Sequence, residues 1–79
     1  MRSRITMVPM YPFVRSLRKA DHIRRYSIQA TSAGWEVREE QDSEIVRHSY
    51  YQDWHRVERA LQSFSLKLNV LREEGWSDL

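Results

Sequence analysis

The sequence predicts an α+β domain in which an antiparallel, three-stranded β-meander packs against one long C-terminal α-helix. Two features of the apolar pattern support this fold class. Between residues 24 and 51, apolar and polar residues alternate with a period of two, which is typical of strands buried on one face only. From residue 54 onwards, the apolar spacing changes to the three-and-four pattern of an amphipathic helix.

Three strands are expected, and turn-forming residues separate them. In the first strand, Tyr26 and Ile28 share a face, and in the second strand Trp35 and Val37 do so. The segments Thr-Ser-Ala-Gly and Gln-Asp-Ser between the alternating runs favour tight turns. The strands are expected over residues 24–31, 34–40 and 44–51.

The third strand contains two adjacent apolar residues, Ile45 and Val46, so alternation alone allows either of them to face the core. If Ile45 points inward, Arg47 follows it, and burying an unpaired guanidinium group is costly. We therefore expect the residues of the opposite register to face the core, namely Val46, His48 and Tyr50.

A single helix is expected over residues 54–74. Its apolar positions form one stripe: Trp54, Val57, Leu61, Phe64, Leu68 and Leu71. Asp53 precedes the stripe as an N-cap, which accepts hydrogen bonds from the free amides of the first turn. Gly75 ends the helix, and Trp76 is placed to fold back onto the apolar stripe.

Residues 1–22 are expected to form a basic, proline-containing arm that precedes a single domain, residues 23–79. Pro9 and Pro12 favour extended or irregular backbone, and a short helix is expected over residues 13–20. The first 25 residues carry seven basic residues and one acidic residue, a net charge of +6, whereas the rest of the chain carries −4. Such an arm can bind nucleic acid or an acidic partner, or it can neutralise the acidic domain of its own chain.

The composition excludes several kinds of site. The chain has no cysteine, so it forms neither disulfides nor cysteine-based zinc or iron–sulfur sites. Only two glycines are present, Gly34 and Gly75, which leaves no glycine-rich phosphate loop. His55 and Glu58 share a helix face, but this spacing is too common to indicate a metal site. We therefore expect no metal, no cofactor and no catalytic residues.

The same composition favours a cytoplasmic protein without a membrane span. The lack of cysteine fits a reducing compartment. No apolar run approaches the ~20 residues that a membrane-spanning helix needs.

One surface that the predicted core does not explain is the exposed side of the helix. Leu66 and Val70 lie four residues apart and are therefore adjacent on the helix surface. Arg59, Ser63 and Lys67 flank them. Three interpretations remain open: the N-terminal arm covers the two apolar residues, a partner or a second copy binds them, or they are ordinary scattered apolar residues.

A second surface is the basic arm, whose arginines alternate with aromatic residues. Basic groups beside aromatic rings are used to bind single-stranded nucleic acid. The expected phosphate contacts come from the arm and from the basic side of the helix: Arg15, Arg18, Lys19, Arg24, Arg25 and Arg56.

From these observations we expect a small, non-catalytic interaction or regulatory module that binds another protein through the exposed helix face or a sheet edge. A lone helix on three strands has a thin core, and small domains often need oligomerisation as extra support. A homodimer is therefore expected. The alternative is a nucleic-acid-binding protein that uses the basic arm and the basic side of the helix.

Overall fold

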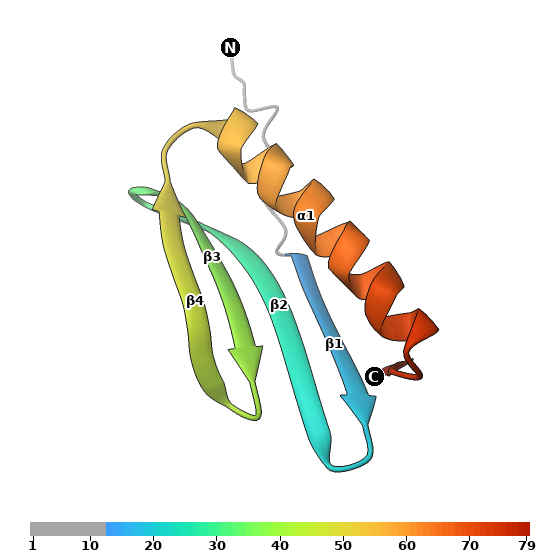
Figure 1. The fold of residues 1–79 in the computed structure, drawn as a ribbon. Coiled ribbons are helices and arrows are strands. Elements are labelled where there is room, and N and C mark those ends of the chain that lie inside the picture. Colours follow the sequence, from blue (N-terminus) through green and yellow to red (C-terminus); the bar gives the residue numbers. More distant parts are fainter. Residues whose placement is uncertain (1–12) are drawn as a thin grey trace.

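A computed structural model describes residues 13–79 and shows an antiparallel sheet of five strands with one helix on one of its faces (Figure 1). Four strands form a meander in chain order: β1 (Phe13–Lys19), β2 (His22–Thr31), β3 (Gly34–Gln41) and β4 (Glu44–Tyr51). The helix α1 (Trp54–Glu73) follows, and the short strand β5 (Ser77–Asp78) then pairs with β1. The strand order across the sheet is therefore β4-β3-β2-β1-β5.

The predicted α+β class is confirmed, and so are α1 and its two ends. The Asp53 carboxylate accepts a hydrogen bond from the His55 backbone N–H at 2.9 Å, as expected of an N-cap. At the other end, Gly75 has a φ of +100°. The Trp76 N–H donates to the Leu71 carbonyl at 3.0 Å, which closes the last turn as predicted.

The short helix predicted over residues 13–20 is wrong, because this segment forms strand β1. The meander consequently has four strands instead of three. Phe13 and Leu17 lie four residues apart, a spacing that fits one helix face and also one strand face, so the local pattern did not discriminate between the two. Pairing with β2 decides the conformation, and it runs from Phe13 opposite Ile28 to Lys19 opposite His22. The predicted extended backbone of residues 1–12 lies outside the described residues.

The core-facing register predicted for β4 is also wrong, because the three residues expected in the core are exposed: Val46, His48 and Tyr50. The pairing of β3 with β4 shifts between Glu39 and Glu40, and this β-bulge uncouples the two ends of the strand. Arg47 lies on the helix side of the sheet but remains exposed. The cost of burying the Arg47 guanidinium, which argued against this register, does not arise, because β4 is an edge strand and Arg47 stays in contact with solvent.

The core lies between α1 and the helix-facing side of the sheet. The Phe64 ring packs against the Tyr26 ring, with 4.9 Å between the ring centres. The rings of Trp35 and Trp54, 5.3 Å apart, pack the start of α1 against β3. The buried apolar residues are Leu17, Tyr26, Ile28, Val37, Val57, Phe64, Leu68 and Leu71.

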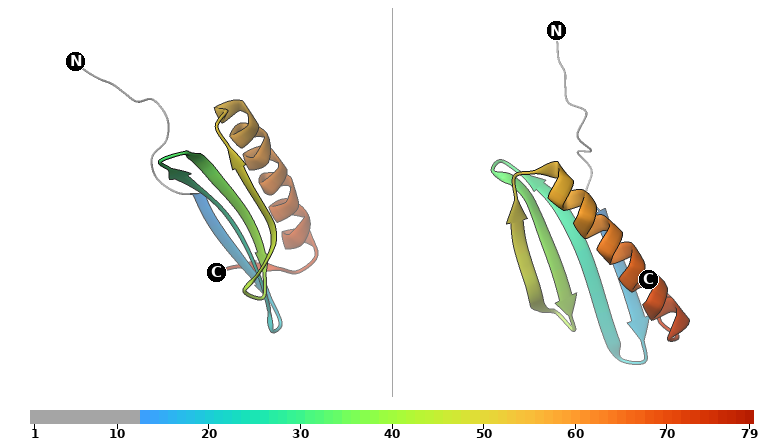
Figure 2. Two further views of the ribbon diagram at one scale, coloured as in Figure 1. Left: turned by 90° about the vertical axis from the view of Figure 1, so that its left-hand side faces the viewer. Right: turned by 45° about the horizontal axis from the view of Figure 1, so that its top comes forward.

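Figure 2 shows the sheet as one layer and α1 as a second layer. The opposite face of the sheet, which we call the open face, carries no element from the described part of the chain. Within residues 13–79, no helix qualifies as a membrane span by its length and hydropathy.

Candidate functional site

The residues predicted to contact a protein partner lie along one side of α1, which we call the α1 flank. Its members line grooves between the helix and the sheet: Arg59, Ser63, Leu66, Lys67 and Val70. Leu66 is 68% exposed and Val70 is 51% exposed. Lys67 has a structural contact, because its Nζ atom lies 3.1 Å from Glu39 Oε1 and ties α1 to β3.

An apolar groove of about 390 Å³ runs between the C-terminal half of α1 and the strands β2 and β3. Leu66 and Val70 form its exposed wall, and the buried residues Tyr26 and Leu71 contribute to its base. Charged side chains also line the groove: Arg24, Glu39, Lys67 and Glu74. The sequence-predicted apolar pair is therefore part of a concave surface with a mixed-charge border.

The Tyr26 hydroxyl is buried and has no hydrogen-bond partner within residues 13–79. Burial raises the pKa of Tyr26 above its ordinary value of 10.0. The nearby Arg24 guanidinium opposes this shift, and the Glu39 carboxylate adds to it. A buried hydroxyl without a partner lowers the free energy of unfolding.

A second groove, of about 290 Å³, lies between the N-terminal half of α1 and strand β4. Arg47 and Tyr51 line it from β4, and Arg56, Arg59 and Ser63 line it from α1. It joins a hollow of about 560 Å³ at the end of β4, because Tyr51 and Arg56 line both. We call the two together the basic groove. Its three arginines form no ion pair with any residue in the range 13–79.

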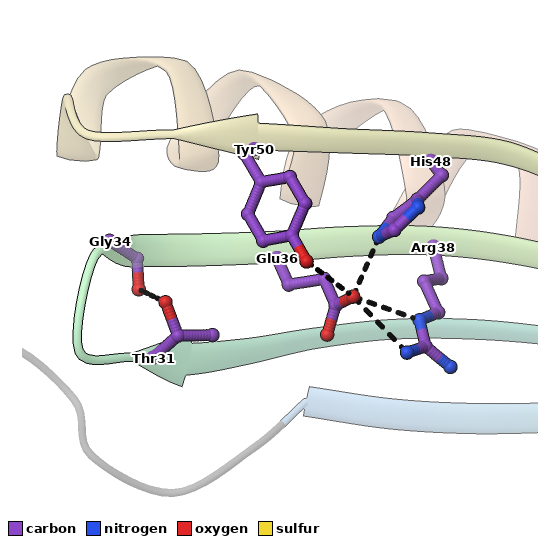
Figure 3. Close-up of polar contacts among 6 residues, drawn as sticks. All are labelled: Thr31, Gly34, Glu36, Arg38, His48 and Tyr50. Atoms are coloured by element: carbon purple, nitrogen blue, oxygen red, sulfur yellow. Dashed lines mark hydrogen bonds and ion pairs between the residues drawn. The ribbon is translucent and has the colours of Figure 1, made fainter.

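On the open face, side chains of β3 and β4 converge on Glu36 (Figure 3). Glu36 Oε2 accepts hydrogen bonds from His48 Nε2 at 2.6 Å, from Arg38 Nε and Nη2 at 3.2 and 3.1 Å, and from Tyr50 Oη at 3.2 Å. The bond from His48, supported by Arg38 and Tyr50, outweighs desolvation and holds the pKa of Glu36 below its ordinary value of 4.5. A carboxylate with a lowered pKa is a weak general base at neutral pH. The cluster therefore binds the edge strand β4 to β3.

The residues predicted to contact nucleic acid do not come together on one surface. Because side chains alternate along β1 and β2, Arg18 and Arg25 lie on the open face. Arg56 lies on the other side of the sheet, in the basic groove.

Three further members of that predicted set make contacts within the fold. The Arg24 guanidinium lies over the Trp76 ring, 5.1 Å from its centre. Lys19 Nζ donates to the Glu74 carbonyl at 2.7 Å and so satisfies a free carbonyl at the end of α1. The Arg15 guanidinium lies 4.9 Å from the centre of an aromatic ring of its own strand.

Sequence reasoning missed Arg47 and Tyr51 as groove residues and missed the cluster around Glu36. Both omissions follow from the wrong register of β4, which turned Arg47 away from the helix and His48 toward it. The bulge that sets the true register has no signal in the alternation pattern. The pairing of Glu36 with Arg38 could have been found, since the two residues lie on one face of a strand.

No metal-binding group of three or more His, Cys, Asp or Glu side chains occurs in the described part of the chain. Among known proteins, no family model matches the chain, and no curated protein and no solved structure matches it significantly. The function is therefore inferred from the geometry of the two grooves.

Proposed function

We propose that the protein is a small, non-catalytic interaction module that binds a second copy of itself through the α1 flank. The proposal rests on one observation: two adjacent large apolar side chains, Leu66 and Val70, remain exposed on a helix whose apolar stripe is otherwise buried or half-buried. Exposed apolar residues that lie together mark interaction surfaces, whereas single ones are ordinary.

Two charged residues, Arg59 of the α1 flank and Glu73 beyond its C-terminal end, support an antiparallel arrangement of two α1 helices. Arg59 and Glu73 lie at equal distances along the sequence on either side of Leu66, about two helical turns away, so the three share one face. Neither Arg59 nor Glu73 forms an ion pair with a residue in the range 13–79. A two-fold axis at Leu66 brings Arg59 of each copy opposite Glu73 of the other.

The small core and the shape of the sheet edge are consistent with this choice. A domain of this size buries a modest share of its surface, and oligomerisation is a usual source of additional stability. The free edge of β4 is a less suitable route, because a β-bulge and an exposed charge such as Arg47 are features that keep edge strands from pairing.

Light scattering after size exclusion tests the proposal. The full chain is expected to be a dimer, and the Leu66→Glu/Val70→Glu variant is expected to be a monomer, because four carboxylates then face one another across the axis. A monomeric parent chain, or a variant that remains a dimer, contradicts the proposal.

A charge exchange tests the arrangement itself. Arg59→Glu and Glu73→Arg are each expected to weaken the dimer, and the combined variant is expected to restore it because the ion pairs form again with exchanged signs. Glu58→Arg, which changes a helix charge outside the flank, serves as the control and is expected to leave the dimer intact. Failure of the combined variant to restore association excludes the antiparallel pairing at Leu66.

The alternative predicted from the sequence, nucleic-acid binding by the basic arm, has weaker support. Of its expected contacts, Lys19 and Arg24 bind groups of their own chain, and Arg18 and Arg25 lie on a different face from Arg56. The arginines that do share a groove belong to β4 and α1.

A further inference from the structure

We propose that the basic groove is a second binding site, which holds the phosphates of a single-stranded nucleic acid beside Tyr50 and Tyr51. This inference goes beyond self-association, because the basic groove lies along the N-terminal half of α1 and the end of β4. The Leu66 and Val70 pair lies along the C-terminal half of the helix.

The first argument is charge. Arg47, Arg56 and Arg59 line the basic groove. Among the described residues, the only acidic one that lines it is Asp53, whose carboxylate caps α1. Guanidinium groups that share a groove without a carboxylate partner in the described range repel one another, and an anion between them removes that repulsion. The proposed dimer pairs Arg59 with Glu73 of the second copy, which leaves Arg47 and Arg56 to hold the phosphates. The planar fork of arginine also matches the oxygens of a phosphate group.

The position of the groove on the helix adds to this positive potential. The groove lies along the first turns of α1, where the helix dipole carries its positive end. The first turn contains no acidic residue. The Asp53 carboxylate already compensates part of this positive end, so the helix dipole adds a small share and Arg56 supplies most of the attraction for a negative group.

The second argument is the combination of size and aromatic side chains. A hollow of about 560 Å³ falls within the ~300–1,000 Å³ range of ligand pockets, so it takes a base together with its phosphate. Tyr51 lines both this hollow and the groove beside α1. Tyr50, which is 63% exposed and donates to Glu36, lines the hollow from the open face. Aromatic rings beside basic groups bind single strands with little dependence on sequence, because every base has a face that stacks.

The third argument is the path of the groove, which favours a single strand over a duplex. The hollow begins near Ala33 in the β2–β3 turn, passes the end of β4 at Tyr51 and continues between β4 and α1 toward Ser63. A flexible single strand can follow this turn around the strand end. A duplex, which stays stiff over about 150 base pairs, cannot.

Fluorescence anisotropy with a labelled oligothymidine and a duplex of equal length, measured on the full chain over a range of salt concentrations, tests the proposal. Two phosphate contacts, from Arg47 and Arg56, predict a slope of about −1.4 for the logarithm of the affinity against the logarithm of the salt concentration. Arg47→Ala/Arg56→Ala is expected to remove most of the salt dependence and to reduce the affinity roughly 25-fold near 0.1 M salt.

A matched control separates the groove from net charge. Arg18→Ala/Arg25→Ala removes the same charge from the open face and is expected to keep the affinity within about twofold of the parent value. All four arginines are exposed, so thermal unfolding is expected to show a folded protein in both variants. Equal losses in the two variants would show that net charge alone attracts the oligonucleotide, and this result would overturn the proposal.

Two further results would also overturn it. The first is equal affinity for the single strand and the duplex. The second is that a polyglutamate peptide of matched charge displaces the labelled strand as well as unlabelled oligothymidine does, which would assign the groove to acidic peptides. Absence of salt-dependent binding removes the site altogether. Leu66→Glu/Val70→Glu is expected to retain the affinity per chain for the single strand, so failure of self-association and failure of this site are distinguishable.

Discussion

Glu36 lies on a face of the sheet that no described element covers, yet it is only 8% exposed, because Arg38, His48 and Tyr50 surround its carboxylate. Their hydrogen bonds favour the ionised form in the folded protein and lower the pKa of Glu36 below 4.5. A group with a lowered pKa in the folded state stabilises the fold above its unfolded pKa. This stabilisation disappears as the pH falls through the folded pKa.

Glu36→Gln is therefore expected to lower the melting temperature at pH 7. The difference from the parent chain should shrink as the pH falls below about 4.5 and vanish once the carboxylate of the parent is protonated. Thermal unfolding followed by circular dichroism between pH 7 and 3 measures this. Glu58→Gln is the control, because Glu58 is an exposed carboxylate whose only ion pair in the described range is with His55 at 3.4 Å. Equal melting temperatures for the parent and Glu36→Gln at pH 7 would contradict a stabilising role.

For Tyr26, whose hydroxyl has no hydrogen-bond partner within residues 13–79, we expect a substitution that stabilises the fold. Tyr26→Phe removes a buried polar group without removing the ring that packs on Phe64. The free energy of unfolding is expected to rise by about 1 kcal/mol, since a buried hydroxyl without a partner is destabilising. Urea unfolding measures this change. A loss of stability instead would show that the hydroxyl has a hydrogen-bond partner in solution, and the nearby Arg24 and Glu39 side chains are the first candidates.

At the scale of elements, the sequence predicted the elements whose apolar period is long and regular. The α1 stripe, its Asp53 cap and its Gly75 end follow from local rules, and the alternating residues of β2 and β3 do as well. The strand β1 was missed because the spacing of Phe13 and Leu17 suits a helix face as well as a strand face, and only long-range pairing with β2 selects the strand. The register of β4 was missed because a bulge shifts it.

Of the two candidate sites, one could be predicted from the sequence and the other could not. The α1 flank was predictable, because Leu66 and Val70 depart from a regular helical pattern. The basic groove was not, because Arg47 reaches it only through the shifted register of β4, and the contribution of Tyr51 depends on that same strand.

Two leucine-to-alanine substitutions, one in β1 and one on the exposed side of α1, test whether residues 13–19 form a strand of the core. Leu17→Ala is expected to lower the free energy of unfolding by about 3 kcal/mol, because Leu17 is fully buried. Leu66→Ala, in which the side chain is exposed, is expected to change it by less than about 0.5 kcal/mol under conditions where the chain is monomeric. Chemical unfolding of both variants decides the point. A neutral Leu17→Ala substitution would mean that residues 13–19 do not form a core strand.

At the scale of the whole molecule, the α1 flank has an apolar half and a basic half. In the proposed dimer, the apolar halves of the two copies contact each other. Antiparallel helices that cross at Leu66 leave the N-terminal ends of the two copies at opposite ends of the pair. The two basic grooves would then be far apart, and a single strand long enough to reach both would bind more tightly than a short one, through its higher effective concentration at the second groove.

The central claim is that the α1 flank is the surface that binds a second copy. The measurement that tests it most directly is a dilution series of ¹H–¹⁵N correlation spectra of the full chain, with Leu66→Glu/Val70→Glu as the control. The account predicts concentration-dependent shifts at Arg59, Leu66, Val70 and Glu73 that disappear in the control variant. Shifts confined to the open face, or spectra that do not change with concentration while light scattering shows a monomer, would contradict it.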